Sequence, residues 1–237
     1  MSESVLKVVL HRLVASALAG VAVIGLSSSV PAAIKAAPHI SGVAVVVDGD
    51  TIDIAGQRIR LEGIDAPEMA QTCGRGWFGT WACGKASAKA LTALIGSREI
   101  TCSRQGTDKY GRMLGVCSVA GEDLNATMVR SGMAWAFVKY SKAYVDIEMQ
   151  AKAQKAGIWQ GEAEAPWVYR EQHWQAAKQT APDGCAIKGN VSAKGQIYHM
   201  PWSPWYNKVS VNAARGERWF CSEAEAQKAG WRASQTH

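Results

Sequence analysis

The chain has 237 residues, 48% of them hydrophobic and 19% charged, so it can bury the core of one sizeable domain with a smaller unit beside it. Its 26 Lys and Arg exceed its 20 Asp and Glu, which gives a net charge of +6. This mild excess permits a polyanionic partner without requiring one. No C-x-x-C pair occurs, which argues against a zinc ribbon or a thioredoxin-type site.

Residues 1–36 have the layout of an export signal. Lys7 and Arg12 precede an apolar run from Leu13 to Leu26, and serines and small residues follow. The run is shorter than the roughly 20 residues that a spanning helix needs, so cleavage is favoured over anchoring. Apolar residues continue past the serines, so an uncleaved membrane anchor stays open as the alternative. We expect a periplasmic or secreted protein.

The six cysteines are an even number, which in an exported chain predicts disulfides. Six cysteines allow 15 connectivities. Proximity along the chain favours the pairs Cys73 with Cys83, Cys102 with Cys117, and Cys185 with Cys221.

The stretch from His39 to Ile64 predicts three strands. Asp48-Gly49-Asp50 breaks the first two and is in itself a hairpin signal, while Ala55-Gly56-Gln57 turns into the third. In the third strand Arg60 lies on the face opposite Ile59 and Leu61, so it should point away from the core. Pro67 cannot continue a ladder, which predicts a loop over residues 65–68.

Glycine and tryptophan over residues 69–82 predict an irregular loop closed by a short disulfide. The patterns that follow predict helices over 84–95, 124–131 and 145–156, and strands over 99–104 and 113–119. The loop 105–112 between those strands delivers a second arginine, Arg112. A change to Glu, Ala and Pro near 161–166 marks the end of a first domain, taken as residues 40–165.

Residues 166–182 read as one more helix and a linker, and 183–237 as a small second module. Short strands are expected over 195–199 and 218–220. Ser222 and Glu225 form a capping box that starts a final helix.

Three carboxylates, Asp50, Asp65 and Glu68, lie close in sequence to Arg60. Each has a structural explanation when taken alone, as part of a hairpin, a proline turn or a surface ion pair. Together they make poor core material, because an unpaired buried charge costs several kcal/mol, roughly 3 or more. Hard cations prefer oxygen ligands and arginine matches a phosphate, so the set suits a metal and phosphate site.

These residues, in their order along the chain, resemble the staphylococcal (thermonuclease) type nucleases over about Ile40 to Trp159. The matching segments are Val47 to Thr51, Arg58 to Leu61, Gly63 to Glu68, Asp108 to Arg112, Leu124 to Gly132 and Gly157 to Trp159. The resemblance implies an α+β fold: a five-stranded OB-type β-barrel with three helices, to which a small C-terminal α+β module is added.

The resemblance also implies roles. Asp50, Asp65 and the main-chain carbonyl of Ala66 match calcium ligands, and Asp48 matches an acidic residue that shapes the metal pocket. Glu68 matches the glutamate that activates water, and Arg60 and Arg112 match the arginines that grip the phosphate. Lys109, Tyr110 and Tyr140 fall near nucleotide-contacting positions. Val138 stands where the family has a second tyrosine, and Ala66 where it has a threonine.

The expected function is an exported, calcium-dependent endonuclease that cleaves DNA and RNA with low sequence preference and leaves 3′-phosphorylated products. We expect a monomer without a stable protein partner. A non-catalytic nucleic-acid-binding module on the same barrel is the alternative. The tryptophan-rich tail supports a third reading, an envelope or interaction protein.

The C-terminal module distantly resembles an Ada-type metal-binding domain, whose relatives bind zinc with four cysteines. Here Cys185 and Cys221 remain, with His199 as a third candidate ligand. A closed tetrahedral site therefore cannot be assembled, and a disulfide is favoured.

Overall fold

The structure is a computed structural model that describes residues 39–234. The predicted signal or anchor over residues 1–36 lies outside these residues. Within 39–234, no helix has both the length and the apolar character needed to cross a bilayer.

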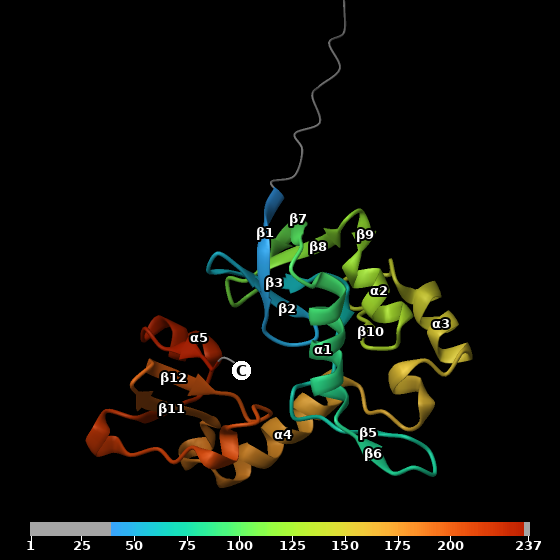
Figure 1. Ribbon diagram of the computed structural model, residues 1–237. Coiled ribbons are helices and arrows are strands. Elements are labelled where there is room, and N and C mark those ends of the chain that lie inside the picture. Colours follow the sequence, from blue (N-terminus) through green and yellow to red (C-terminus); the bar gives the residue numbers. More distant parts are fainter. Residues whose placement is uncertain (1–38, 235–237) are drawn as a thin grey trace, which may run out of the picture. The chain divides into compact units, whose positions relative to one another are not determined.

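A closed barrel forms the first half of the described chain (Figure 1). Its strands are β1 (His39–Val46), β2 (Thr51–Ile54), β3 (Gln57–Leu61), β7 (Glu99–Thr107) and β8 (Met113–Val119). They follow the order β3-β2-β1-β7-β8, and β8 pairs back with β3 in parallel, Ile59 opposite Met113. This confirms the predicted five-stranded OB-type barrel.

The core lies inside the barrel and under three helices. In β8 every second residue, from Met113 to Val119, is buried. The helices are α1 (Cys83–Ile95), α2 (Leu124–Arg130) and α3 (Val145–Ala153). Leu91, Ile95 and Leu124 join the barrel core with 1% exposure or less. The three helices expected from the sequence are therefore present, and α1 ends at Gly96, whose φ of 60° suits glycine.

Short strands complete the domain and correct two boundaries. They are β4 (Ile64–Asp65), β5 (Cys73–Gly74), β6 (Thr80–Trp81), β9 (Glu122–Asp123) and β10 (Trp135–Ala136). Asp65 was expected in a loop, but it pairs with Trp135 and so ends a strand. The strand β7 reaches Thr107, which shortens the predicted loop 105–112 to residues 108–112.

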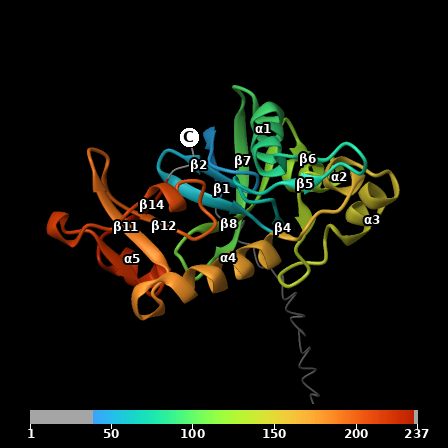
Figure 2. The same ribbon diagram turned by 90° about the horizontal axis from the view of Figure 1, so that it is seen from below.

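The helix α4 (Pro166–Thr180) follows the barrel domain and is seen as one continuous helix in Figure 2. A second sheet then forms, in the order β13-β11-β12-β14. Its strands are β11 (Ile187–Ser192), β12 (Gly195–His199), β13 (Arg218–Phe220) and β14 (Arg232–Ala233). Tyr198 and Phe220 are buried in its small core. This module has a core of its own, as expected for a second folded unit.

The last helix, α5 (Glu223–Lys228), starts as the capping box predicts. The Ser222 hydroxyl accepts from the Glu225 amide, and the Glu225 carboxylate accepts from the amide of Cys221 rather than that of Ser222. Four 3₁₀ helices fill the connections: η1 (Gly157–Gln160), η2 (Pro182–Gly184), η3 (Tyr206–Lys208) and η4 (Ala213–Arg215).

All three predicted disulfides are present. They join Cys73 to Cys83, Cys102 to Cys117 and Cys185 to Cys221. His199 hydrogen-bonds to Asn190 instead of completing a zinc site. Disulfides are typical of proteins in an oxidising compartment, so they are consistent with the expected location outside the cytoplasm.

Candidate active site

The site is built where β2, β3 and β4 meet. Asp50 ends the turn before β2, and its carbonyl accepts from the amide of Leu61. The neighbouring Thr51 pairs with Arg60 across β2 and β3. Asp65 follows at the end of β4 and is fully buried. Three short strands therefore bring these side chains to one place, although they are up to 15 positions apart in sequence.

Close backbone packing fixes this place against α1. A Cβ on Gly49 would lie 2.1 Å from the Ser87 hydroxyl, and one on Gly84 would lie 1.8 Å from the carbonyl of Glu68. Neither distance is sterically allowed, so the glycines let α1 approach the turn before β2 and the loop after β4. The helix thereby holds both carboxylate-bearing segments.

The Asp50 carboxylate has hydrogen bonds on both oxygens. Oδ1 accepts from Arg60 Nη1 at 2.7 Å and from the Thr51 hydroxyl at 3.1 Å. Oδ2 accepts from the amide of Ala66 at 2.8 Å. Asp48 orients the turn, because its Oδ1 accepts from the amide of Asp50 at 3.1 Å. The predicted ligand set Asp50, Asp65 and Ala66 is thus contiguous.

Asp65 and Glu68 share an arginine that the sequence did not identify. Arg170 of α4 donates through Nη2 to Asp65 Oδ2 at 2.8 Å and through Nη1 to Asp65 Oδ1 at 3.1 Å. The same Nη1 lies 2.8 Å from Glu68 Oε1. Arg60 Nη2 also reaches Asp65 Oδ1, at 2.9 Å. Two guanidinium groups therefore hold three carboxylates.

Burial and the two arginines set the protonation of this cluster. Burial raises the pKa of Glu68 to about 7, partly opposed by Arg170. Burial also raises the pKa of Asp50 above its ordinary value against the lowering effect of Arg60. The pKa of Asp65 is lowered, because Arg60 and Arg170 outweigh the cost of its burial. A carboxylate that titrates near neutral pH is well suited to general-base catalysis.

Arg112 lies outside this hydrogen-bonded cluster. The parallel pairing of β3 with β8 brings its backbone beside β3, but its Nε donates to Asp108 Oδ2 at 2.6 Å. Among the described residues it has no hydrogen bond or ion pair with Asp50, Asp65 or Glu68. The guanidinium that joins Arg60 at the carboxylates is that of Arg170.

The expected nucleotide-contacting residues lie in two exposed segments. Tyr110 sits under two cations, with Lys109 Nζ 4.7 Å and the Arg112 guanidinium 5.3 Å from its ring centroid. Tyr140 is 65% exposed and packs edge-on against Phe137 at 5.2 Å. Val138, beside it, is 59% exposed. These side chains are accessible to a ligand, and the structure does not join them to the carboxylate cluster.

Comparison with known proteins covers the same two halves of the chain. Residues 58–161 match the family model described as staphylococcal nuclease homologue. Residues 169–233 match a model described as ArfC, rather than the Ada-type domain expected from the sequence.

Three relatives align over about half of this chain. The succinoglycan biosynthesis protein ExoI of Rhizobium meliloti is 42% identical over 132 residues, 54% of this chain and 69% of that protein. An uncharacterized endonuclease of Escherichia coli O157:H7 is 36% identical over 53% of this chain and 80% of its own. The micrococcal nuclease of Shigella flexneri is 34% identical, over 53% and 76%. The chain therefore belongs to the staphylococcal nuclease homologue family, the phosphodiester-hydrolysing enzymes built on this barrel.

Proposed function

We propose that this protein is an exported, calcium-dependent endonuclease that cleaves DNA and RNA with low sequence preference and leaves 3′-phosphorylated ends. The nuclease activity follows from family membership. The observation that carries the finer proposal is the cluster of Asp50, Asp65 and Glu68 around Arg60, in which acidic ligands, a base and a phosphate-binding group lie within hydrogen-bonding distance of one another.

The residues present fit calcium by their chemistry. Asp50, Asp65 and the carbonyl of Ala66 would hold the ion through oxygen, the donor that a hard cation prefers. When bound, the ion would neutralise phosphate charge as a Lewis acid. No group of three or more His, Cys, Asp or Glu side chains in residues 39–234 is arranged around a metal position. That finding agrees with a donor set of two carboxylates and a main-chain oxygen, whose carboxylates are at present bonded to guanidinium groups.

The other residues supply binding and proton transfer. Arg60 presents a planar fork to the phosphate, and its contacts would strengthen as negative charge builds on the phosphate oxygens. Arg112 has only Nε engaged with Asp108, so its two terminal nitrogens are available for a second fork. Glu68, with a pKa of about 7, would accept the proton of the attacking water.

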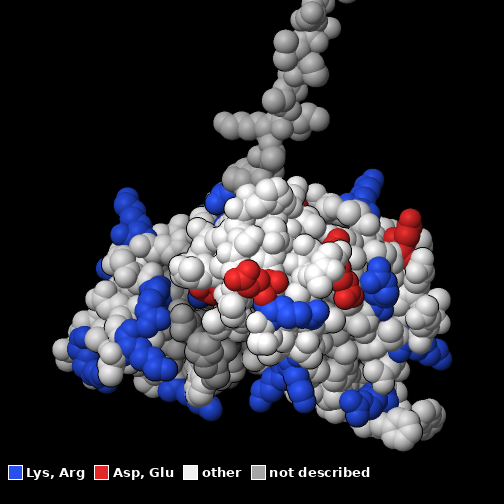
Figure 3. Space-filling model, turned by 45° about the horizontal axis from the view of Figure 1, so that its top comes forward, with Lys and Arg blue, Asp and Glu red and all other residues white. Residues whose placement is uncertain are grey.

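The surface charge supports a polyanionic substrate. The chain carries a net charge of +6. On the face drawn in Figure 3, basic side chains spread across the lower half, whereas acidic ones lie nearer the middle. An excess of positive charge raises the rate at which a polyanion meets the protein.

We also propose that residues 1–36 direct export, that 40–165 form the nuclease domain, and that 166–182 link it to the module 183–237. The protein is proposed to act as a monomer. Three disulfides support an oxidising location.

Digestion of plasmid DNA and of RNA in calcium, and then in a chelator, tests the proposal. Both polymers should be cut with calcium and spared with the chelator, and a phosphatase should release phosphate from the 3′ ends. The alternative, a binding module without turnover, predicts retardation of the plasmid on a gel with no cleavage in either buffer.

A further inference from the structure

The contacts of Arg170 carry an inference about how the site selects its cation. Every carboxylate oxygen of Asp50 and Asp65 already accepts a hydrogen bond. Both oxygens of Asp65 accept from Arg170, which contributes no hydrogen bond to Asp50. A cation can use Asp65 only by displacing or sharing that guanidinium.

Arg170 is held firmly for a residue outside the nuclease domain. Its side chain is 22% exposed, and Asp65 is fully buried beneath it. Its helix is fixed on the barrel side by Trp167, whose ring stacks on Phe137 with centroids 5.4 Å apart. The segment just before the helix is tied by Gln71, whose amide donates to the carbonyl of Glu164 at 2.7 Å.

A divalent ion and a guanidinium on the same carboxylate repel each other. At a few ångströms, like charges near a protein surface interact by several kcal/mol, about 4 at an effective dielectric constant of 20. We propose that Arg170 is a specificity-determining residue: it competes with calcium for Asp65 and Glu68 and so sets the calcium concentration that the nuclease needs. This inference rests on the calcium requirement proposed above.

Calcium binding by calorimetry on the full chain tests the competition without depending on turnover. Replacing Arg170→Gln should tighten calcium binding by about tenfold or more, because the competing charge is removed. Lys178→Gln is the matched control, since Lys178 is exposed on the same helix and carries the same charge. It should bind calcium as the wild-type protein does.

A second variant protects the test if Arg170→Gln unfolds. Trp167→Ala loosens the helix while leaving the arginine in place, and should tighten calcium binding in the same direction by a smaller factor. Thermal unfolding verifies that each variant is folded.

The outcomes separate the two proposals. If the wild-type protein binds calcium and neither variant changes the affinity, or if Arg170→Gln weakens it, the competition is wrong while the calcium site stands. If no form of the protein binds calcium, the calcium requirement fails and the competition fails with it.

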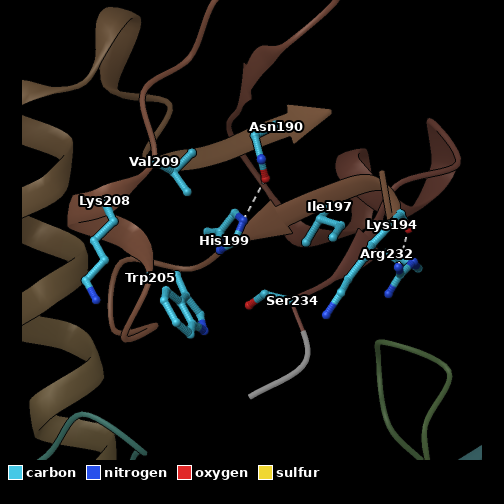
Figure 4. Close-up of a pocket in the computed structure, with 9 residues that line it drawn as sticks. All are labelled: Asn190, Lys194, Ile197, His199, Trp205, Lys208, Val209, Arg232 and Ser234. Atoms are coloured by element: carbon cyan, nitrogen blue, oxygen red, sulfur yellow. Dashed lines mark hydrogen bonds between the residues drawn. The ribbon is translucent and has the colours of Figure 1, made fainter. Parts of the chain in front are cut away.

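A separate observation concerns a pocket in the C-terminal module (Figure 4). The cavity has a volume of about 370 Å³ and lies between β12, η3 and β14. Its lining comprises Asn190, Lys194, Ile197, His199, Trp205, Lys208, Val209, Arg232 and Ser234. Three of the nine are basic and none is acidic.

These basic side chains have no acidic partner among residues 39–234. Arg232 donates to the carbonyl of Lys194, and Lys208 Nζ lies 4.7 Å from the centroid of the Trp205 ring. In Figure 4 Lys208 and Trp205 lie on one side of the pocket, and Lys194 and Arg232 on the other. Unpaired cations that gather around a cavity attract an anion.

The pocket also offers groups that a phosphate alone would not use. Trp205 is 39% exposed, and Ile197 and Val209 add apolar wall. His199 Nε2 bonds to Asn190 Oδ1 at 2.8 Å, while its Nδ1 is buried without a hydrogen-bond partner. Cations beside an exposed aromatic ring are the usual equipment of single-stranded nucleic-acid binding.

We propose that this pocket binds a single-stranded segment of nucleic acid, with phosphates at Lys194, Lys208 and Arg232 and a base against Trp205. It would give the nuclease a second hold on its substrate, independent of the carboxylate cluster.

Fluorescence anisotropy with a labelled single-stranded oligonucleotide, in chelator, measures this binding on the full chain. Changing Lys194, Lys208 and Arg232 together to Gln should weaken binding by about tenfold or more and lower the salt dependence by about 0.7 per lost phosphate contact. Changing Lys85, Lys89 and Lys228 to Gln removes the same charge from exposed residues outside the pocket. That control should weaken binding far less.

Trp205→Ala separates a nucleic acid from any other polyanion. It should weaken binding of the oligonucleotide about fivefold or more and leave heparin binding unchanged, because only the former stacks a base. Equal losses in the two charge variants, or a Trp205→Ala protein that binds the oligonucleotide normally, would overturn the proposal.

Discussion

Arg112 and Asp108 are joined by an ion pair in which Nε lies 2.6 Å from Oδ2. Asp108 Oδ1 also accepts from the amides of Tyr110 and Arg112, so one carboxylate closes the whole loop between β7 and β8. The guanidinium is thereby held by one edge, with its terminal nitrogens unbonded within the described chain. Arg60 differs, because both of its terminal nitrogens are bonded to buried carboxylates.

This difference predicts that Arg112→Ala removes most turnover and leaves the fold intact. The Arg112 side chain is 30% exposed, and its partner Asp108 can be solvated after the change. We expect a fall in kcat/KM on DNA of about 10²-fold or more, the usual effect of losing one donor to developing charge. Circular dichroism melting should give a midpoint near that of the wild-type protein. Near-normal rates would show that Arg112 has no role in catalysis.

Arg60→Ala should lose activity and stability together. Removing this guanidinium leaves Asp50, which is 3% exposed, without its only ion-pair partner among the described residues. Breaking a buried pair from one side typically costs about 3 to 5 kcal/mol. Urea unfolding should therefore show a clearly lower midpoint, unlike that of Arg112→Ala. Equal midpoints for the two variants would contradict the pairing described here.

Glu68→Gln should abolish most turnover while preserving the site. The amide keeps the shape of the side chain and can still accept from Arg170 through its oxygen, but it cannot take a proton from water. Rates on DNA should fall by about 10²- to 10⁴-fold. Glu62→Gln is the matched control, since Glu62 is a nearby partly exposed glutamate whose side chain has no hydrogen bond or ion pair with the cluster. Its rate should stay close to that of the wild-type protein.

Local patterns in the sequence predicted the barrel and much of the site. The alternation of Ile59 and Leu61 with Arg60 gives the face of β3, and the carboxylates that flank these strands converge as the strands pair. Arg170 could not be found this way, because it lies 105 residues from Asp65 on a helix beyond the family resemblance. Its only sequence signal is an arginine early in a helix that directly follows the domain.

Two further differences have the same cause. Asp65 lies in a strand because it pairs with Trp135, 70 positions away, and no neighbouring residue announces that contact. The bond from Arg112 to Asp108 is local, but the family role assigned to Arg112 directed attention to phosphate instead. Contacts that depend on tertiary packing are thus the ones that the pattern of residues leaves out.

The two disulfides best suited to comparison should have separate effects on the barrel. Cys102 and Cys117 are fully buried and directly opposed in β7 and β8, and they enclose a span of 15 residues. Replacing both by alanine should destabilise the barrel by about 3 kcal/mol, as expected for a loop of that length. Replacing Cys185 and Cys221 removes a bridge in the C-terminal module, so the carboxylate cluster and turnover of a short oligonucleotide should persist. Urea unfolding with turnover measured on the same samples distinguishes the pair, and a larger loss of turnover in the second variant would mean that the module supports the catalytic site.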